Sequence, residues 1–584
     1  MKITPRSSAI VKPATETPKC ILWNSNIDLV IPRIHIPTVY FYKAGSAVDC
    51  GHLKESLGRA LVPFYPMAGR LKDKGRGRID INCNGEGILF VEAVADGYMS
   101  EYGEYFAPCM KMRQLIPQVD YTKGHATFPL LILQVTFFKC GGVAIGVGVH
   151  HHVADGLAAL WFLNYWADVA RGIEKDVKPF FDRTLLRARD PPKAKFQHVE
   201  YQPPPLLLKA EDAYQEKIGI NSDYAKVNGD YMKVNDDGEV DGVHIKVSGD
   251  IAKVNGDYIK VNGDYIKLND CQFIEENDVF PKENSSYSLE SGNHNQASHN
   301  ICMVNGNYKE TNGDYHKSLT HIITETSGYA KKLEAVSQML HKEDEPEKRP
   351  QSAEEFGKMS EDKVNTEYYG PISAELFIFS QEQVNSLKKK AEEHALPGDR
   401  PFSSYEVLSA HIWRCACLAR GLQEAQLTKL YIATDGRSRL QPALPSDYFG
   451  NVIFTAAPVV QVGQLVGAPL ADAARHIRHT VQVMDDEYLR SAVDFLELQP
   501  DLAEFSRGAH TFKTPNLGIT SWVRLPIYGA DFGWGPPLSM GPAGVPFEGL
   551  AYLLPGPPGD KRLRLSITLS PDHMLRFQEF IYQI

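Results

Sequence analysis

The stretch GVGVHHHVADGLAAL, residues 146–160, carries the change from one kind of secondary structure to another. The apolar residues before the histidines predict the end of a buried strand. The continuation places apolar residues at helical spacing as far as Gly172, so a helix is expected; Asp155 is a candidate for its N-cap or for a group that holds a histidine ring or locks the turn. Because a strand and a helix together fix the turn between them, this is a common position for catalytic groups.

The remainder of the chain outside its middle alternates between strand and helix patterns. Residues 130–149 predict two strands joined by a hairpin at Lys139–Gly142. In the second half, helices are predicted over 380–394 and 403–422, and strands over 429–436, 451–460, 517–526 and 563–570. The chain is therefore predicted to be mixed α/β, in two halves with a long connection between them.

That connection, residues 209–368, differs from the flanking domains predicted at 1–208 and 369–584. It has no tryptophan, is rich in Asn, Gly, Asp, Lys and Tyr, and repeats a seven-residue unit, as KVSGDIA from Lys246 and as KVNGDYI from Lys253 and from Lys260. Gly and Asn in each copy oppose a coiled coil, Asn-Gly-Asp is compatible with short hairpins, and the calcium-binding EF-hand pattern is missing. We predict a low-complexity, disordered insertion whose deletion with a short linker preserves activity.

The composition argues against several function classes. The chain has 584 residues, a net charge of −10 and no long basic stripe, so nucleic acid is not an expected partner. The sequence contains no run of about 18 apolar residues for a membrane span, and its N-terminus has no apolar signal core. Nine scattered cysteines indicate reduced thiols. We expect a cytoplasmic protein that is a monomer.

The three consecutive histidines allow three interpretations. Successive strand residues point to opposite faces, so His150 and His152 share one side and His151 takes the other. A metal site would need more converging ligands, and since no HExxH or Cys/His set is present, we predict no metal. A satisfied buried histidine beside an N-cap is the second interpretation. The third is a general base, because histidine titrates near neutrality; without a GxSxG elbow, the attacking hydroxyl would then belong to a substrate.

Two motifs and several longer stretches bear on this choice. HHVADG at 151–156 resembles the HxxxDG motif of the BAHD family of plant acyl-CoA-dependent acyltransferases, and DFGWG at 531–535 resembles that family's second motif. Stretches that resemble the hydroxycinnamoyltransferases within the family include LWNSNIDLVIP (22–32), ALVPFYPMAGRL (60–71), DRTLLRARDPP (182–192), YFGNVIF (448–454), RGAHTFK (507–513) and NLGITSWVRLP (516–526). The resemblance covers nearly all of the two flanking domains and none of the insertion.

The resemblance implies a fold and a catalytic mechanism. The fold would be two chloramphenicol-acetyltransferase-like domains, with the active site in a tunnel between them. His151 would be the general base, and the indole of Trp522 would stabilise the tetrahedral oxyanion. Asp155 would be structural and pair with an arginine, for which Arg437 and Arg439 are candidates. Without the family, Trp522 would be better explained as a core aromatic.

The resemblance also implies the substrates. The donor would be a hydroxycinnamoyl-CoA (p-coumaroyl or caffeoyl), used as a cosubstrate with no further cofactor, and the acceptor a hydroxy acid such as shikimate or quinate. Arg507 matches the family arginine that binds the acceptor's carboxylate, although its residue type alone suggests a solvated surface side chain. Other matches to the pocket are Thr520, His35, Thr38 and Tyr40. The residues of the second motif, which would shape the C-terminal domain without touching substrate, are Asp531, Gly533, Trp534 and Gly535.

The chain departs from the family pattern at a few positions. Ile36 replaces a hydroxyl that faces the acceptor in relatives, Thr38 adds a methyl group, and Pro536 stands where an arginine often follows the second motif. A missing hydroxyl leaves a polyhydroxy ring partly unpaired, so shikimate stays open against quinate or another small hydroxy acid. Three further functions stay open as well: a related acyltransferase with an alcohol, amine or flavonoid acceptor, a non-catalytic binding protein on this fold, and a condensation domain of a peptide-assembling enzyme.

Overall fold

The computed structural model describes residues 1–43, 48–103, 105–203, 371–545 and 547–584, together with the backbone of strands β9 to β16. The chain divides into two compact units, one formed by Met1–Ala210 with Arg349–Ile584 and the other by Glu211–Lys348. The two halves that flank the insertion therefore fold as one unit.

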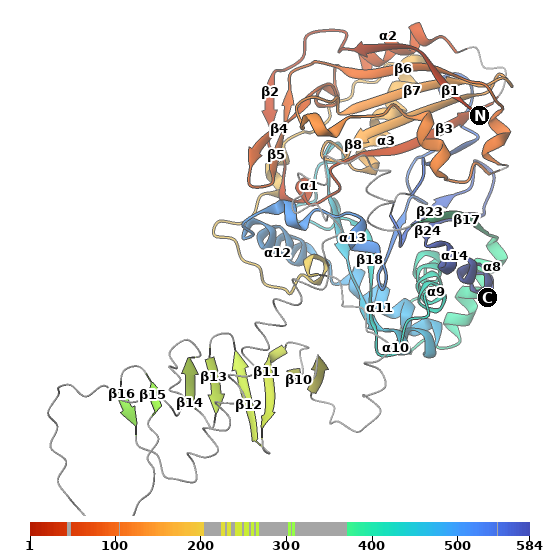
Figure 1. Ribbon diagram of the computed structural model, residues 1–584. Coiled ribbons are helices and arrows are strands. Elements are labelled where there is room, and N and C mark those ends of the chain that lie inside the picture. The colour runs from red at the N-terminus through yellow and green to blue at the C-terminus, as the bar shows by residue number, and fades with distance from the viewer. Residues whose placement is uncertain are drawn as a thin grey trace, which may run out of the picture. The chain divides into compact units, whose positions relative to one another are not determined.

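A six-stranded sheet lies at the centre of the first half (Figure 1). In spatial order its strands are β1 (Ile3–Val11), β6 (Ile88–Ala95), β7 (Leu131–Phe137), β8 (Val143–His150), β3 (His35–Tyr42) and β22 (Ser539–Pro542). Neighbours are antiparallel except β6 and β7, which are parallel. A second sheet contains β2 (Cys20–Leu22), β5 (Arg78–Cys83) and β4 (Arg70–Gly75) in that order.

Strand β8 is buried along its whole length. Its sequence is apolar on both faces, as expected for a strand that is covered on both sides. A Cβ at Gly146 would clash with the carbonyl oxygen of Leu115, and one at Gly148 would lie 2.6 Å from the Cγ1 atom of Ile132, so both positions require glycine. Because β7 and β8 pair as neighbouring antiparallel strands, the hairpin predicted between them is confirmed.

Helix α3 (Gly156–Ala170) follows β8 after a short turn. Asp155 is its N-cap and accepts a hydrogen bond from the Ala158 backbone N–H at 3.0 Å. The helix ends before Gly172, which has a φ of +75°, a conformation that favours glycine. The predicted transition from strand through turn to helix is confirmed. The other α-helices among the described residues of the first half are α1 (Asn26–Leu29) and α2 (Cys50–Ala60).

The second half contains a seven-stranded sheet. Its strands are β17 (Ser373–Phe379), β24 (Leu563–Leu569), β23 (Leu550–Pro555), β21 (Leu517–Ser521), β18 (Leu427–Asp435) and β19 (Ile453–Ala456), with β20 (Val459–Gln461) also paired to β18. Strand β21 is parallel to both of its neighbours, β18 and β23, and the other pairs are antiparallel. Parallel and antiparallel strands thus combine with helices in both halves, as the predicted mixed α/β class requires.

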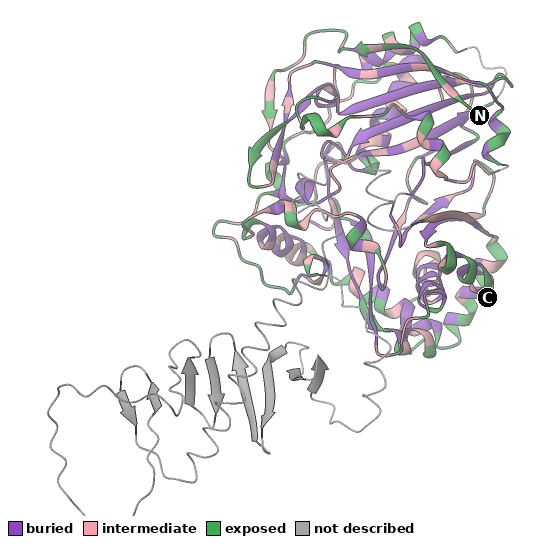
Figure 2. Cartoon of the chain, viewed as in Figure 1, coloured by how far each residue is buried: buried purple, intermediate pink, exposed green. Residues whose placement is uncertain are grey.

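The predicted helices of the second half are also present. Helices α8 and α9 begin at capping boxes, formed by Ser380 with Gln383 and by Ser403 with Glu406. Helix α9 is buried over most of its surface (Figure 2). The helices of this half are α8 (Gln381–Glu392), α9 (Ser404–Ala419), α10 (Val462–Gly467), α11 (Leu470–Gln482), α12 (Asp486–Glu497), α13 (Ala509–Phe512) and α14 (Pro571–Phe580).

Strand β22 belongs to the second half by sequence and to the first half by pairing. It adds to the edge of the first sheet beside β3. The motif DFGWG lies just before it, and Phe532 packs against Trp166 of α3 with ring centroids 4.6 Å apart. Trp534 contacts Tyr42 of β3 at 5.3 Å. The motif therefore packs the start of β22 against α3 and β3 of the first half.

Only strand backbones are described within the insertion 209–368. The strands β9 (Tyr224–Val227), β10 (Asp230–Val234), β11 (Val240–Val247), β12 (Asp250–Asn255), β13 (Tyr258–Val261) and β14 (Asp264–Lys267) pair in sequence order, and β15 (Cys302–Val304) pairs with β16 (Asn307–Lys309). Antiparallel pairing of successive repeats is what the Asn-Gly-Asp turns favour. The other residues of the insertion lie outside the described ones, so its disorder stays a prediction.

Among the described residues, no helix combines the length and the apolar character that a membrane crossing requires.

Candidate active site

A cavity of about 310 Å³ lies where the two halves meet. The first half contributes residues of β3, the end of β8 and the start of α3, and the second half contributes residues of β18, β21, β22 and β23. The residues predicted from the sequence that line this cavity are His151, Asp155, Thr38, Tyr40, Arg507, Thr520 and Trp522. Folding therefore brings together side chains that lie as far apart in the sequence as β3 and β21.

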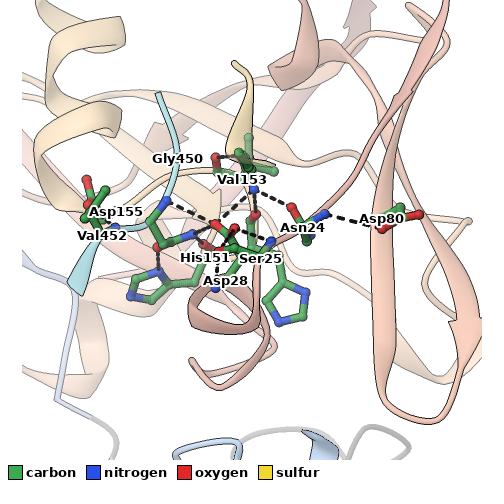
Figure 3. Close-up of polar contacts among 12 residues, drawn as sticks. Asn24, Ser25, Asp28, Asp80, His151, Val153, Asp155, Gly450 and Val452 are labelled. Atoms are coloured by element: carbon green, nitrogen blue, oxygen red, sulfur yellow. Dashed lines mark hydrogen bonds and ion pairs between the residues drawn. The ribbon is translucent and has the colours of Figure 1, made fainter. Parts of the chain in front are cut away.

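The imidazole of His151 is oriented by a residue of the other half. Its Nδ1 atom lies 3.1 Å from Oδ1 of Asn451. The Asn451 amide nitrogen donates in turn to the His151 carbonyl oxygen at 2.8 Å and to Oδ1 of Asp28 at 2.9 Å. Figure 3 shows His151 and Asp28 within this single hydrogen-bonded network.

These contacts determine which nitrogen of His151 carries the proton. The Asn451 nitrogen has two acceptors, so a flipped amide would place its oxygen against two other oxygens. The Asn451 oxygen must therefore face His151, where it can only accept a hydrogen bond. It follows that Nδ1 of His151 is protonated and that Nε2 carries the free lone pair.

The surroundings of His151 also set its charge. Burial lowers the pKa of His151 from its ordinary value, because the charged form loses solvation, and this effect exceeds the opposing influence of Asp155, Asn451 and Asp28. The imidazole is therefore neutral at neutral pH. A neutral imidazole with a free Nε2 lone pair is the form that can accept a proton.

Asp155 holds the turn that carries His151 and makes no hydrogen bond to the imidazole. Its carboxylate receives two hydrogen bonds from Arg437, at 2.8 and 3.0 Å, and one from the backbone N–H of Val452 at 3.2 Å. The other candidate, Arg439, donates instead to the carbonyl oxygens of Val481 and Met484. Arg437 is therefore the partner, and this bidentate pair ties the N-terminus of α3 to the second half.

Two polar groups at the cavity have no hydrogen-bond partner among the described residues. They are the Tyr40 hydroxyl and the Nε and Nη2 atoms of Arg507, and all three atoms are buried. The Arg507 guanidinium lies 5.9 Å from the ring of Tyr201, and its backbone N–H donates to Val30. A buried polar group without a partner costs about 1–3 kcal/mol, and a charged one costs more. The arrangement therefore favours an anion beside Arg507.

Three further predicted residues line the same cavity. Trp522 is almost fully buried and packs against Tyr552 with ring centroids 5.1 Å apart. Thr520 lies on β21, just before Trp522, and Thr38 lies on β3. Ile36 lines the cavity as well, so the replacement of a hydroxyl by a branched apolar side chain changes the lining itself.

The expectation that His35 lines the pocket is wrong. His35 is 4% exposed; its Nδ1 lies 2.7 Å from the Tyr121 hydroxyl and its Nε2 lies 2.8 Å from the Pro129 carbonyl oxygen. Burial lowers the pKa of His35 to about 4. The reason is strand parity: Ile36, Thr38 and Tyr40 line the cavity, and His35 is out of phase with these three residues along β3.

The residues of the second motif do not line the cavity. Asp531 accepts hydrogen bonds from the backbone N–H groups of Gly533 and Gly535, at 2.8 and 2.9 Å. Both glycines have a positive φ, of +96° and +85°, which explains the residue type at these positions. Pro536 adjoins this loop, and nothing in the structure explains why it replaces an arginine. The motif builds a tight loop at a distance from the cavity.

Sequence reasoning missed three residues of this region. Asn451, Asp28 and Arg183 form the hydrogen-bonded network behind His151. All three lie in stretches that resemble the family, but no spacing rule connects them with His151 because they come from three distant parts of the chain. No group of three or more metal-ligating side chains is found in the part of the chain that the structure describes.

Comparison with known proteins gives one family. The model of the transferase family matches residues 1–233 and 315–584. The shikimate O-hydroxycinnamoyltransferase of Nicotiana tabacum is 41% identical over 585 residues, and the match covers 100% of both chains. A hydroxycinnamoyl-CoA:5-hydroxyanthranilate N-hydroxycinnamoyltransferase of Avena sativa is 40% identical over 590 residues, again with 100% of both chains covered.

A solved structure shares the fold. The crystal structure of vinorine synthase superimposes with a TM-score of 0.56 at 20% identity, covering 98% of this chain and 96% of that one.

Proposed function

The chain belongs to the BAHD family of acyl-CoA-dependent acyltransferases, and from that membership we propose that it transfers a hydroxycinnamoyl group from CoA to a small acceptor that carries a carboxylate. The donor is p-coumaroyl-CoA or caffeoyl-CoA. The acceptor is a hydroxy acid such as shikimate or quinate, and the reaction joins its hydroxyl oxygen to the acyl carbon. Acyl-CoA is the cosubstrate, and the mechanism uses no further cofactor.

One observation carries the proposal. A neutral imidazole and an unpartnered guanidinium, those of His151 and Arg507, line the same cavity from opposite halves of the protein. The guanidinium suits a carboxylate, because its two buried nitrogens can each donate a hydrogen bond. An acceptor held there by its carboxylate extends into the cavity that His151 also lines.

The chemistry follows from the position of the lone pair. With donor and acceptor bound together, Nε2 of His151 removes the hydroxyl proton as the oxygen attacks the thioester carbonyl. The indole N–H of Trp522 is our candidate donor to the tetrahedral oxyanion; a comparable donor in another enzyme is worth about 2.7–4 kcal/mol. Collapse expels the CoA thiolate, and the protonated His151 returns the proton to it. No covalent enzyme intermediate forms.

A second acceptor class is favoured by Ile36. The cavity lining is largely apolar, with Ile34, Phe512 and Phe547 among its residues. A planar aromatic acid packs against such side chains without leaving hydroxyls unpaired. The Avena sativa relative described above is named for 5-hydroxyanthranilate, an aminobenzoate, which makes an aromatic amine the second candidate nucleophile.

An acceptor panel tests the proposal. Purified enzyme is incubated with p-coumaroyl-CoA and, separately, shikimate, quinate, smaller hydroxy acids and 5-hydroxyanthranilate, and products are read by mass spectrometry. The expected result is an ester or amide of one carboxylate-bearing acceptor. Product from none of these carboxylate-bearing acceptors would remove the role of Arg507. If alcohols and amines without a carboxylate also give no product, a non-catalytic binding protein is favoured.

A further inference from the structure

A buried ion pair lies behind the imidazole of His151. Asp28, in α1, and Arg183, at the start of the 3-10 helix Arg183–Leu186, approach to 3.0 Å, and both side chains are 0% exposed. We propose that this pair is a positioning device for the acyl transfer, with Asp28 holding the imidazole of His151 through Asn451 and Arg183 holding the turn that follows His151. The inference rests on the proposed role of His151 as general base.

The contacts of Asp28 connect α1 to the second half. Its Oδ1 accepts from both the backbone N–H and the side-chain nitrogen of Asn451, at 3.0 and 2.9 Å. Its Oδ2 accepts from the backbone N–H and the hydroxyl of Ser25, at 2.8 and 2.6 Å. Asp28 thereby fixes the Asn451 amide in the orientation that places the proton of His151 on Nδ1.

The contacts of Arg183 reach the backbone on the other side of His151. One guanidinium nitrogen donates to the His152 carbonyl oxygen at 2.9 Å, and the other donates to the Val153 carbonyl oxygen at 2.5 Å. The first nitrogen also donates to the side-chain oxygen of Asn24. Asp28 and Arg183 thus act on the ring and on the backbone of the same turn.

Stability alone does not account for the pair. A buried ion pair is weak evidence for stability, since an apolar pair of similar volume often stabilises a fold equally well. What distinguishes this pair is the direction of its hydrogen bonds, because those to Asn451, His152 and Val153 all lead to the surroundings of one imidazole. A comparable buried pair, Glu406 with Arg478 at 3.1 Å, instead serves the start of α9, where the Ser403 backbone N–H donates to Glu406.

Loss of the Asp28 charge should act on His151 in two ways. The freed Asn451 amide could rotate and donate to Nδ1, which would move the proton to Nε2 and remove the base. In addition, Asp28 and Asp155 are the carboxylates whose charge raises the pKa of His151, and they are paired with Arg183 and Arg437 respectively. Removing one of them lowers that pKa further.

The test compares Asp28→Asn with the matched variant Glu406→Gln. For Asp28→Asn we expect kcat per folded molecule to fall by about 10²-fold, the usual consequence of misplacing a catalytic group by about 1 Å. The KM values for acyl-CoA and acceptor should change little, and the acid limb of the pH profile should move to lower pH. Glu406→Gln should lose stability while keeping its kcat and its pH profile.

A second variant covers the case in which Asp28→Asn fails to fold. Arg183→Lys keeps the positive charge beside Asp28 and loses the planar fork that reaches two carbonyl oxygens, so kcat should fall while the pH profile stays in place. Folded fractions come from circular dichroism. A folded Asp28→Asn with parental kcat and an unmoved acid limb would overturn the inference. If only Arg183→Lys folds, a parental kcat in that variant would overturn it.

The tautomer of His151 can be read without turnover. Long-range ¹H–¹⁵N spectra of histidine-labelled protein, with His151 assigned from His151→Asn, should show the proton on Nδ1 in the parent and a shift toward Nε2 in Asp28→Asn. The same spectrum in both would count against the positioning role. An unchanged parental tautomer in an enzyme that acylates no acceptor would instead count against the proposed function.

Discussion

At the end of β8, consecutive histidines point to opposite sides of the chain, and the two sides differ in what surrounds the imidazole. On one side, His151 lines the cavity, donates to Asn451 and keeps Nε2 free. On the other side, His150 and His152 are 0% exposed and pack against each other with ring centroids 5.1 Å apart. His150 also stacks on Phe128 in the core at 5.6 Å.

The two sides differ in the hydrogen-bond partners and charged neighbours that surround each imidazole. Burial lowers the pKa of all three histidines, but those of His150 and His152 fall well below the ordinary value, and several of their ring nitrogens have no partner among the described residues. Of the three, His151 has nearby groups that raise its pKa against the effect of burial and an amide that selects its tautomer. A histidine becomes a usable base through its neighbours more than through its position in a motif.

The largest expected effect tests this contrast directly. His151→Ala should lower kcat by about 10²–10⁴-fold, since general-base catalysis is typically worth that much, with little change in the free energy of unfolding. His150→Ala should do the opposite and destabilise the fold by about 2 kcal/mol or more, because it opens a cavity in the core. Steady-state kinetics and urea unfolding measure the two effects. Equal losses of kcat per folded molecule in both variants would break the comparison.

The next effect extends the contrast to Arg507, which also lines the cavity and has two buried nitrogens without a partner among the described residues. Arg507→Ala should raise the acceptor KM by about 10- to 100-fold, because a charged hydrogen-bonded pair is worth about 1.5–3 kcal/mol, and should leave the acyl-CoA KM nearly unchanged. Arg507→Lys keeps the charge without the fork and should be intermediate. A similar rise in both KM values would mean that Arg507 acts on the cavity as a whole.

A smaller effect is expected at Ile36, where the cavity lining itself differs from the family pattern. Ile36→Ser restores a hydroxyl and should shift the ratio of kcat/KM between shikimate and 5-hydroxyanthranilate toward shikimate by up to about 10-fold. The measurement is a competition assay with both acceptors. The matched control Val39→Ala lies on the opposite face of β3 and should leave the ratio of the two kcat/KM values unchanged. An equal shift of that ratio in Val39→Ala would mean that any loss of packing in the strand produces the effect.

The smallest expected effect is a difference between the pH dependence of kcat/KM and the pH dependence of the free energy of unfolding. Because burial lowers the pKa of His151, its base form persists below the ordinary histidine value of about 6.5, so kcat/KM should fall only at lower pH, with a slope of about 1. The core histidines affect the free energy of unfolding instead. Because unfolding exposes them to water, the unfolded chain binds more protons than the folded one. The free energy of unfolding should therefore decrease as the pH drops from about 6.5 toward 4, the pKa of His35. Coinciding curves would contradict the separation.

Much of the fold follows from local patterns. The hairpin between β7 and β8, the N-cap Asp155 and the helix that ends before Gly172 were all predicted from periodicity and turn chemistry, and all are confirmed. The opposite orientations of His151 and its two neighbours also follow from strand parity. The same rule, applied to β3, would have excluded His35, because it is out of phase with Thr38 and Tyr40.

Other parts of the site could not be predicted locally. Asn451 is 300 residues from His151, and Asp28 is 423 residues from Asn451. The choice of Arg437 over Arg439 likewise depended on which of two nearby arginines reaches Asp155. Sequence patterns record the periods of strands and helices, and they do not record which distant side chains meet after folding.

The amino-acid sequence by itself determined the strand, the turn and the helix around His151, because hydrophobic period and capping act within a few residues. It also determined which residue types were available for an acyl transfer. Only the tertiary structure decided that Asn451 and Asp28 reach His151, that Arg507 lines the same cavity without a partner and that His35 does not. Hydrogen bonds and burial between distant segments form only when the two halves pack together, and they set the tautomer and the charge on which the proposed chemistry depends.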